Sequence, residues 1–526
     1  MKKITYNLMA MAVAVSALGS CSDKWDDHYA PEAAGSSDAT VYEMIKNDPE
    51  LALFGKMIDI AGYSDLLNTS QTFTVWAPSD ASLASVDLSD TDEVKRIVAN
   101  HIARFNVSTA NPAGQGVRMY NGKMLYFEGN TFGGVAMERS DVLARNGVLH
   151  VLTERIPYSY NIREYIDTHA ETTSISEFLS RFDELRFDEA SSIPLDIDEN
   201  GNTVYDSVKV QYNRLLDHPV YGLGNILSED SVFTMLVPDN NAWRTAYERI
   251  RPLYEVFDEN EAVADSVSDV QTSLAVMRDF IYRARITSPS GKMRATSGTE
   301  ISDMASFFAG AEKINASNGM IWLTSDVNYP MEETFNPIIR VEAEDPAGRV
   351  RVGNTTIYTR VISTDNQFAS EISEGSYIEV LGASASTQPA VTFDIPNTLS
   401  GEYDIYAVFV PASVDDETVT GEQTCLSFIL TCNNENGKKT EKAFSSADFV
   451  TEPTAMTTIK VAEGYKFPVS NYYDNLWLME DGHDASLINT TTKLNVKTNV
   501  SNSEYNSGKY VRRFRIDCIY LVPTQK

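Results

Sequence analysis

Two apolar segments of the chain share one pattern of hydrophobic positions. Phe73–Pro78 and Phe233–Pro238 are runs of apolar and β-favouring residues that end in proline, which predicts a buried strand in each place. Ser79 and Asp239 follow the prolines, and side-chain oxygens at these positions are suited to cap the first turn of a helix. The pattern therefore predicts, twice, a strand that leads directly into a helix.

A second motif follows each of these segments. Asn146–Leu152 and Asn318–Leu323 both begin with Asn-Gly and continue as an apolar run, which is typical of a turn entering a strand. The two motifs recur in the same order at similar spacing, and this indicates a duplicated domain. Helices are expected at Val41–Leu67, before the first strand, and at Glu93–Phe105, after it.

The pattern changes at about Ile338, where short strand-like segments begin to alternate with turns and helical periodicity becomes scarce. Eight short strands at this spacing predict an all-β sandwich or jelly roll. The expected strands are Ile339–Glu344, Tyr377–Leu381, Ala390–Ile395, Tyr403–Val410, Leu426–Thr431, Thr458–Val461, Lys493–Val496 and Arg513–Leu521.

The strand that leads into Pro78-Ser79-Asp80, together with Asn-Gly-Val-Leu-His-Val at residues 146–151, resembles the two signature regions of fasciclin (FAS1) domains. The resemblance covers residues 39–157 closely and 172–332 more loosely, since Asn240 replaces the motif aspartate in the second copy and Trp322 stands near the place of His150. It implies an α+β fold that acts in adhesion and extracellular association, by binding.

In adhesive fasciclin relatives, a Tyr-His pair between the signature regions is linked to receptor binding. The nearest match here is Asn100-His101, so the resemblance does not carry that binding over to this chain. We instead expect His101 to be a helix histidine whose hydrogen bonds are satisfied within the domain.

The expected fold is therefore multidomain, with two α+β fasciclin-like domains followed by an all-β jelly-roll sandwich. The first domain is expected at residues 39–160, the second at 170–335 with an insertion at 187–222, and the sandwich at 338–526. The sandwich resembles galactose-binding-like carbohydrate-binding modules through Val341–Asp345, Gly401–Tyr406 and Arg515–Leu521.

The N-terminus has the organisation of an export signal. Lys2 and Lys3 precede the mostly apolar Ile4–Leu18, which is too short to span a bilayer but has the length of a signal-peptide core. Leu18-Gly19-Ser20-Cys21 resembles a bacterial lipobox, so residues 1–20 are expected to be a lipoprotein signal peptide, with acyl chains such as palmitate on Cys21. The alternative is an ordinary secretory signal with a chance cysteine.

Residues 21–38 are expected to form a tether. Its Lys-x-Asp-Asp run at residues 24–27 resembles the export signal of surface lipoproteins in the Bacteroides group, which predicts a lipid-anchored protein of the outer membrane that faces the cell exterior. The formal net charge of −31 disfavours binding to nucleic acid or to anionic lipid headgroups, so the lipid anchor is the expected membrane contact. Cys425, Cys432 and Cys518 form an odd set, expected to be buried thiols, although one pair could form a disulfide.

Glu342 and Glu344 lie two residues apart on a predicted strand, so their carboxylates are expected on one face. In the modules that this region resembles, the matching Glu-x-Glu and a late aspartate, here Asp517, hold a structural calcium ion, which backbone carbonyls and water would complete. The alternative is two exposed acids beside an unrelated aspartate. Asp196–Gly201 matches the opening of an EF-hand loop, but Ser207 replaces the final glutamate, and a hairpin turn is the simpler explanation.

An aromatic and amide-rich segment is the candidate ligand site. Tyr472, Tyr473, Asn475 and Trp477 lie in a loop-rich stretch, and rings beside amides suit sugars, which stack through their C–H faces. The alternative is that these rings fill a core. We found no nucleophile elbow, phosphate loop or HExxH zinc motif, so an enzyme is not expected.

These observations predict a surface lipoprotein for adhesion or glycan binding, an accessory part of an outer-membrane polysaccharide-uptake system. Its expected partners are a glycan or surface protein, a TonB-dependent transporter and the lid lipoprotein of that transporter. Two alternatives remain: a structural lipoprotein that docks on the transporter complex without touching glycan, and a hydrolase whose site the sequence does not reveal.

Overall fold

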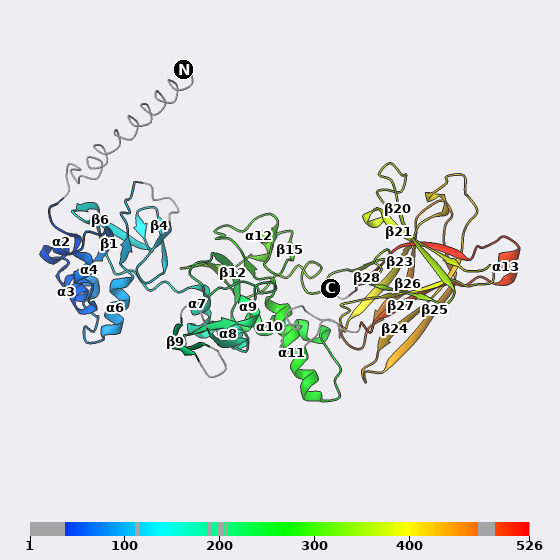
Figure 1. The fold of residues 1–526 in the computed structure, drawn as a ribbon, viewed down its shortest axis with the longest axis horizontal. Coiled ribbons are helices and arrows are strands. Elements are labelled where there is room, and N and C mark those ends of the chain that lie inside the picture. Colours follow the sequence, from blue (N-terminus) through cyan, green and yellow to red (C-terminus); the bar gives the residue numbers. More distant parts are fainter. Residues whose placement is uncertain are drawn as a thin grey trace, which may run out of the picture. The chain divides into compact units, whose positions relative to one another are not determined.

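The computed structural model describes residues 37–110, 116–187, 192–197, 203–206, 208–471 and 490–524 (Figure 1). The chain divides into two compact units. The first holds the residues up to Asn161 together with Leu227–Asp230 and Asn315–Asn318, and the second holds the rest. Each unit is described by itself.

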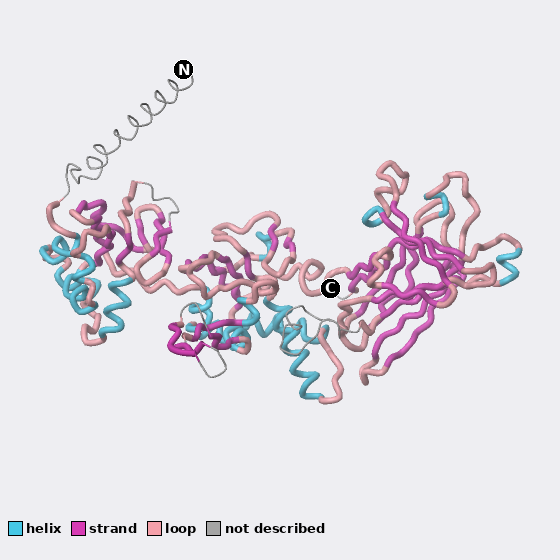
Figure 2. The backbone as a smooth tube through the Cα atoms, in the orientation of Figure 1, coloured by secondary structure: helices cyan, strands magenta, loops and turns pink. Residues whose placement is uncertain are grey.

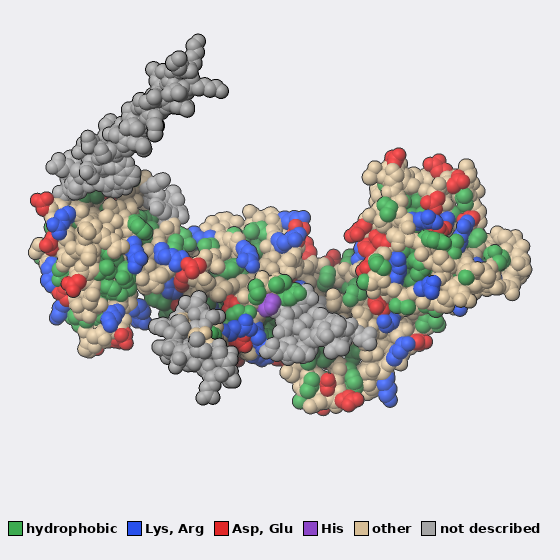
Figure 3. All heavy atoms as spheres, viewed as in Figure 1, with side chains coloured by type: hydrophobic (Ala, Val, Ile, Leu, Met, Phe, Trp, Pro, Cys, Tyr) green, Lys and Arg blue, Asp and Glu red, His purple; other side chains and the backbone are tan. Residues whose placement is uncertain are grey.

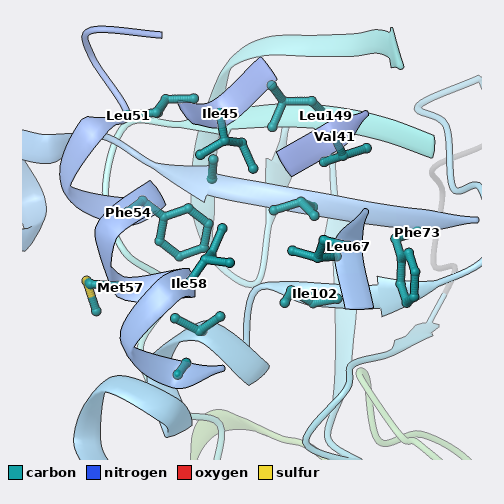
Figure 4. Close-up of a cluster of buried hydrophobic side chains, with 14 of the residues drawn as sticks. Val41, Ile45, Leu51, Phe54, Met57, Ile58, Leu67, Phe73, Ile102 and Leu149 are labelled. Atoms are coloured by element: carbon teal, nitrogen blue, oxygen red, sulfur yellow. The ribbon is translucent and has the colours of Figure 1, made fainter. Parts of the chain in front are cut away.

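The first unit combines helices with one mixed sheet. Its elements are α2 (Val41–Asn47), α3 (Ala52–Ala61), α4 (Ser64–Leu67), β1 (Phe73–Pro78), α5 (Asp80–Leu83), α6 (Thr91–Ala99), β2 (Ile102–Arg104), β3 (Gly116–Arg118), β4 (Met124–Glu128), β5 (Thr131–Phe132), β6 (Val135–Ala144) and β7 (Gly147–Leu152). The seven strands lie in the order β2-β1-β7-β6-β5-β4-β3. Apolar side chains from α2, α3, β1 and β7 converge in one buried cluster, which includes Ile45, Phe54, Phe73 and Leu149 (Figure 4).

Residues 162–324 contain α7 (Ile162–Thr168), α8 (Thr173–Ser180), β8 (Asp183–Phe187), β9 (Ile193–Ile197), β10 (Thr203–Asp206), β11 (Lys209–Asn213), α9 (Arg214–Asp217), β12 (Phe233–Pro238), α10 (Asn240–Ile250), α11 (Glu261–Met277), β13 (Ile281–Tyr282), β14 (Met293–Arg294), β15 (Glu300–Ile301), α12 (Met304–Phe307), β16 (Glu312–Ala316) and β17 (Gly319–Thr324). β9 and β10 pair antiparallel, as the hairpin alternative predicts, while residues 198–202 between them lie outside the described residues. β8 and β11 form a second antiparallel ribbon.

The two sequence motifs of each copy come together as a pair of parallel strands. β1 lies parallel to β7, with Phe73 opposite Gly147 and Pro78 opposite Leu152. β12 lies parallel to β17 in the same register, with Phe233 opposite Gly319. The recurrence that the sequence predicts is therefore present as one strand arrangement, found in both units.

The same hydrogen bonds also recur beside both strand pairs. Thr74 Oγ1 accepts a hydrogen bond from the Val107 amide at 2.8 Å, and Thr234 Oγ1 accepts one from the Ile286 amide at 2.8 Å. Both threonines are fully buried, where an unpaired amide would be costly. Each threonine therefore fixes the segment that runs past its strand.

Trp322 takes over the role of His150. His150 Nε2 lies 3.0 Å from the Val107 carbonyl oxygen, and Trp322 Nε1 donates to the Ile286 carbonyl at 3.0 Å. Both side chains stand at the fourth position of the parallel pair, opposite Trp76 and Leu236 respectively. The second copy therefore differs from the motif in residue type, but it keeps an aromatic ring that hydrogen-bonds to the backbone.

The motif aspartate and its replacement also share one role. Asp80 Oδ1 accepts the Leu53 amide at 2.9 Å, and Asn240 Oδ1 accepts the Ser174 amide at 2.8 Å. Asp239 caps α10 through its side chain, as predicted. Ser79 is the N-cap residue of α5, as predicted, but the predicted side-chain cap was wrong, because its hydroxyl donates to the Thr153 carbonyl instead.

The predicted helix at Glu93–Phe105 is also only partly correct. α6 ends at Ala99, and Ile102–Arg104 forms β2, which pairs antiparallel with β1. Ile102 and Ala103 are buried in that pairing, so tertiary contact overrides the local helical periodicity.

The C-terminal part consists almost entirely of strands and loops (Figure 2). Its elements are β18 (Ile339–Glu342), β19 (Arg349–Val352), β20 (Thr355–Val361), β21 (Ser376–Gly382), β22 (Ala390–Asp394), β23 (Glu402–Phe409), β24 (Cys425–Asn433), β25 (Lys439–Val450), β26 (Thr457–Lys466), β27 (Lys493–Thr498), α13 (Asn502–Asn506) and β28 (Arg513–Pro523). One sheet has the order β20-β21-β28-β23-β26, with β18 also paired to β28, and the other has the order β19-β22-β27-β24-β25.

The two sheets pack through their inner faces. The ring of Phe409 on β23 lies 6.4 Å from the ring of Phe428 on β24, and both side chains are fully buried. Every second residue of β23 is buried, from Tyr403 to Phe409, as expected of a strand with one inward face. All eight predicted strands are present, and β19, β20 and β25 are additional.

A glycine is required where the parallel strands meet. A Cβ atom on Gly147 would lie 1.9 Å from the carbonyl oxygen of Phe73, which belongs to the backbone of β1 and cannot move aside. We therefore expect Gly147→Ala to lower the free energy of unfolding of the first unit by about 3 kcal/mol, as severe overpacking does. Hydrogen exchange of residues 37–161 in the full chain measures this change.

Gly55→Ala is the matched control. Gly55 lies in α3, where an added Cβ meets its neighbours at 3.6 Å, an ordinary contact distance. Because alanine favours helix over glycine by roughly 1 kcal/mol, this variant should be at least as stable as the parent. Equal stability of the two variants would contradict the packing argument.

Candidate functional site

An open groove of about 940 Å³ lies in the first unit. We call it the first-domain groove. It is formed by α6, the turn before β6 and the segment that follows β7. Its lining residues are Ala81, Ser82, Glu93, Arg96, Ile97, Asn100, Gly133, Gly134, Val135, Thr153, Glu154, Arg155, Ile156, Pro157, Tyr158 and Tyr160.

Two tyrosines give the first-domain groove its aromatic surface. The rings of Tyr158 and Tyr160 are half-buried and pack edge to face, with centroids 5.0 Å apart. The guanidinium of Arg96 lies 5.8 Å from the Tyr158 ring centroid, and the Lys123 ammonium lies 5.3 Å from it. Rings fixed by such contacts offer a planar apolar surface to a ligand.

Polar groups stand beside these rings. Arg155 and Glu93 approach each other to 3.7 Å, and Asn100 donates through Nδ2 to the Pro157 carbonyl at 3.4 Å. The groove therefore combines aromatic surface with amide, carboxylate and guanidinium groups, a combination that can bind a polyhydroxylated molecule.

His101 is a buried residue whose hydrogen bonds are satisfied within the domain, as predicted, but it lies in the turn after α6 and not in a helix. It is fully buried, its Nε2 accepts the Ile156 amide at 2.9 Å, and its Nδ1 lies 2.7 Å from the Ile97 carbonyl oxygen. Because Nε2 accepts, Nδ1 carries the proton and donates it. Burial lowers the pKa of His101 to about 4, so the ring is neutral at physiological pH.

A second candidate site is the acidic cluster near the end of β18. Ligand atoms of Glu342, Asp517 and Cys518 all lie within 4.8 Å of one another. Glu342 pairs with Cys518 in the antiparallel ladder of β18 and β28. Asp517 is the extra residue of a β-bulge, because Val408 pairs with Cys518 and Phe409 with Ile516. The bulge re-aims the aspartate toward Glu342, which ordinary alternation would not do.

Glu344 belongs to the same electrostatic environment but not to the strand. β18 ends at Glu342, and Glu344 lies in the turn that follows, which corrects the prediction of a strand reaching residue 344. Burial raises the pKa of the Glu344 carboxyl, and the charge of Glu342 adds to the effect. The structure therefore brings Glu342 and Asp517 together, whereas Glu344 lies outside this close group and acts on Asp517 through its charge.

Among the described residues, the basic side chain within 4.0 Å of these acids is that of Arg340, whose Nε lies 4.0 Å from Glu342 Oε1. Asp517 Oδ1 accepts the Ser373 amide at 3.0 Å, and Glu342 Oε1 accepts the Ser373 hydroxyl at 2.9 Å. Glu342 Oε2 and Glu344 Oε2 are buried without a hydrogen-bond partner among the described residues. Burial, with the charges of Glu342 and Glu344, raises the pKa of Asp517 to about 7. Such unpartnered oxygens suit a hard cation, which takes carboxylate ligands, whereas the Cys518 thiol is too soft for calcium.

The predicted ligand residues Tyr472, Tyr473, Asn475 and Trp477, and the predicted lipidation site Cys21, lie outside the described residues. Phe467, which precedes that segment, is 1% exposed and packs against Tyr403 at 5.6 Å, so this ring belongs to the core. Cys425, Cys432 and Cys518 are buried free thiols.

Residues 49–156 match the Fasciclin domain family. Within the described residues, no helix has the length and apolar character needed to cross a membrane. No curated protein matches the chain.

Solved structures give weak similarities. A FAS1 domain pair from the insect cell adhesion molecule fasciclin I is 14% identical, with a TM-score of 0.20, over 54% of this chain and 98% of that one. A xylan-binding domain of carbohydrate-binding-module family 22 from Paenibacillus barcinonensis is 10% identical, with a TM-score of 0.21, over 36% and 94% of the two chains. A Clostridium thermocellum xylanase fragment with a family 22 module is 13% identical, with a TM-score of 0.21, over 35% and 28%. At these TM-scores, the similarities assign neither a fold nor a ligand to this chain.

The first-domain groove was missed by sequence reasoning. Tyr158-Ser-Tyr160 directly follows Pro157 and the end of the second motif, and two tyrosines on an expected loop could have marked it. Arg96 and Asn100 could not have been found in this way, because they reach the groove from α6, far away in the sequence.

Calcium should stabilise the C-terminal sheets through the acidic cluster. We expect calcium chloride to raise the melting temperature of the full chain by a few degrees, since a cation at a hundred times its Kd contributes about 2.7 kcal/mol. Asp517→Asn should abolish the shift. The variant should still fold without calcium, because it removes a buried charge and its amide oxygen can still accept from Ser373.

Glu435→Gln is the control for this measurement, since Glu435 is an exposed acid on the turn between β24 and β25. It should respond to calcium as the parent does. An identical calcium shift in Asp517→Asn, or no shift in the parent, would rule out the cation site.

Proposed function

We propose that this chain is a lipid-anchored protein of the bacterial cell surface that acts by binding glycan, without catalysis. The observation that carries the proposal is the first-domain groove, where the paired Tyr158 and Tyr160 rings lie beside amide and charged groups. A sugar ring presents an apolar C–H face and a rim of hydroxyls, so it needs both kinds of surface at once.

The domain around the groove supports this function. Most of the groove residues fall within residues 49–156, the segment that matches the Fasciclin domain family. In this proposal, β12 and β17 belong to a second fasciclin-like domain, and the C-terminal sheets form a jelly-roll module. The chain would serve an outer-membrane polysaccharide-uptake system, beside a TonB-dependent transporter and its lid lipoprotein.

One observation favours the alternative, a structural lipoprotein that docks on protein. The ribbon of β8 and β11 exposes apolar side chains, with Leu185 68% and Phe187 46% accessible. Contiguous exposed apolar residues mark contact surfaces in many proteins. This alternative predicts capture of a transporter and no affinity for glycan.

Affinity electrophoresis of the full chain in gels that contain neutral polysaccharides tests the glycan proposal. We expect Tyr158→Ala to weaken binding about tenfold, in line with the contribution of one aromatic contact. Tyr158→Phe keeps the ring and should bind nearly as well as the parent.

Tyr358→Ala is the matched control, because Tyr358 is a half-exposed tyrosine of β20 outside the first-domain groove. It should migrate like the parent. Equal retardation of Tyr158→Ala and the parent would exclude the groove as the glycan site, and no retardation of the parent on any polysaccharide would favour docking.

The membrane anchor is tested separately. If Cys21 carries the lipid, growth with an alkyne-tagged fatty acid should label the parent, and Cys21→Ser should lose both the label and membrane association. Protease added to intact cells should then cleave the parent, as expected for a protein facing outward. An unlabelled parent would contradict the anchor.

A further inference from the structure

The C-terminal part carries a second groove, which lies between the edge strands of the two sheets. β25 is the last strand of one sheet and β26 the last strand of the other. A hollow of about 520 Å³ lies between them, lined by Lys442, Phe444, Val461, Ala462, Glu463, Gly464, Tyr465 and Lys466. We call it the edge groove.

Two rings, one from each sheet, form the apolar part of the edge groove. Phe444 and Tyr465 are half-buried, with ring centroids 6.4 Å apart and planes 75° apart. Two buried residues hold the side chain of Tyr465. Its ring packs on Phe467, with centroids 5.0 Å apart, and its hydroxyl lies 3.4 Å from Cys432 Sγ. The ring is therefore fixed in place before any ligand arrives, which lowers the entropic cost of binding.

Two lysines and one glutamate line the same groove, and the glutamate, Glu463, lies 3.7 Å from Lys460, which leaves the lysines as the excess charge. The Lys442 ammonium lies 5.3 Å from the Phe444 ring centroid and 5.2 Å from that of Tyr465. Lys466 is exposed at the end of β26. Among the described residues, neither lysine has a carboxylate within 4.0 Å, although Lys439 and Lys460 nearby pair with Glu441 and Asp404.

Glu402 is the cross-strand neighbour of Lys466 in the ladder of β23 and β26, but no ion pair joins the two side chains among the described residues. Acidic and basic side chains are interspersed over the surface that Figure 3 shows, so carboxylates lie close to basic side chains on other parts of that surface. Lys442 is exposed, so its ammonium over the two rings stays accessible to an anion.

We propose that the edge groove binds an acidic saccharide, one whose sugar ring carries a carboxylate. The C–H face of the sugar packs on Phe444 and Tyr465, and its carboxylate lies between Lys442 and Lys466. A neutral sugar could use the rings but would leave both charges unmatched. Nucleic acid, which carries far more negative charge, is opposed by the field of the whole chain.

This site shares no residue with the first-domain groove, so either can fail without the other. The competing explanation is that the lysines protect the exposed edge strands from pairing with other chains, as lysine commonly does on such edges. That explanation requires no ligand, and it predicts no loss of saccharide binding when the lysines are replaced.

The test uses the full chain carrying Cys21→Ser, in affinity electrophoresis against polygalacturonate and against fully methyl-esterified pectin. The two polysaccharides share a backbone and differ in carboxylate charge. We expect polygalacturonate to retard the protein, and the esterified form to bind about tenfold more weakly. Lys442→Gln with Lys466→Gln should lower affinity for polygalacturonate about tenfold, as the loss of two exposed ion pairs allows, and should remove its salt dependence.

Lys438→Gln with Lys439→Gln is the control, since it removes the same charge at the start of β25. This control and Tyr158→Ala should both bind polygalacturonate as the parent does. The proposal is overturned if the parent does not bind polygalacturonate, if the esterified form binds equally well, or if the Lys442 and Lys466 double variant is unaffected. It is also overturned if Tyr158→Ala abolishes the binding, because the acidic saccharide would then occupy the first-domain groove.

Discussion

The contact between two parallel strands at an obligatory glycine is the constraint on which the rest of the first unit depends. A Cβ atom at Gly147 would lie 1.9 Å from the carbonyl oxygen of Phe73. β7 can therefore approach β1 this closely only because residue 147 has no side chain. This approach sets the register, and the register sets where β7 ends and where the segment that carries Tyr158 begins. Gly319 and Phe233 repeat the arrangement in β12 and β17. A groove formed from such a segment inherits the rigidity of the sheet, which suits a site that works by contact.

The acidic cluster in the C-terminal sheets illustrates a different constraint. Burying carboxylates together opposes folding, and Asp517 is 1% exposed beside two other acids. A β-bulge is needed to place it there, and bulges commonly re-aim side chains at functional positions. A bound cation would offset the repulsion and tie β18 to β28.

The sequence predicted elements best where a local pattern and the final packing agree. The paired motifs at Phe73 and Asn146, and the eight strands after Ile338, all have buried alternating or continuous apolar residues. β25 was missed because both of its faces are largely polar and exposed. Residues 102–104 were assigned to a helix because their periodicity continues that of α6, whereas pairing with β1 decides their structure. A local sequence pattern does not show which distant strand a segment will pair with.

The same limit applies to the sites. Glu342, Glu344 and Asp517 could be grouped through a resemblance, but the bulge that brings Asp517 to Glu342 has no clear local signal, nor does the turn that leaves Glu344 outside the close group. The groove in the first unit joins Tyr158, near the end of the domain, to Arg96 on α6, and only the fold brings them together. The edge groove was missed for a related reason, because it needs Phe444 and Tyr465 from two different sheets.

The central claim is that a rigid parallel strand pair presents the first-domain groove and that glycan binds there without moving the pair. Hydrogen exchange of the full chain, with and without the polysaccharide that retards it most, measures both parts. The account predicts that amides of β1 and β7 exchange slowest in both states, and that binding slows only residues 153–160 and α6. Faster exchange of β1 and β7 than of the surrounding loops, or a change confined to regions outside the groove, would contradict it.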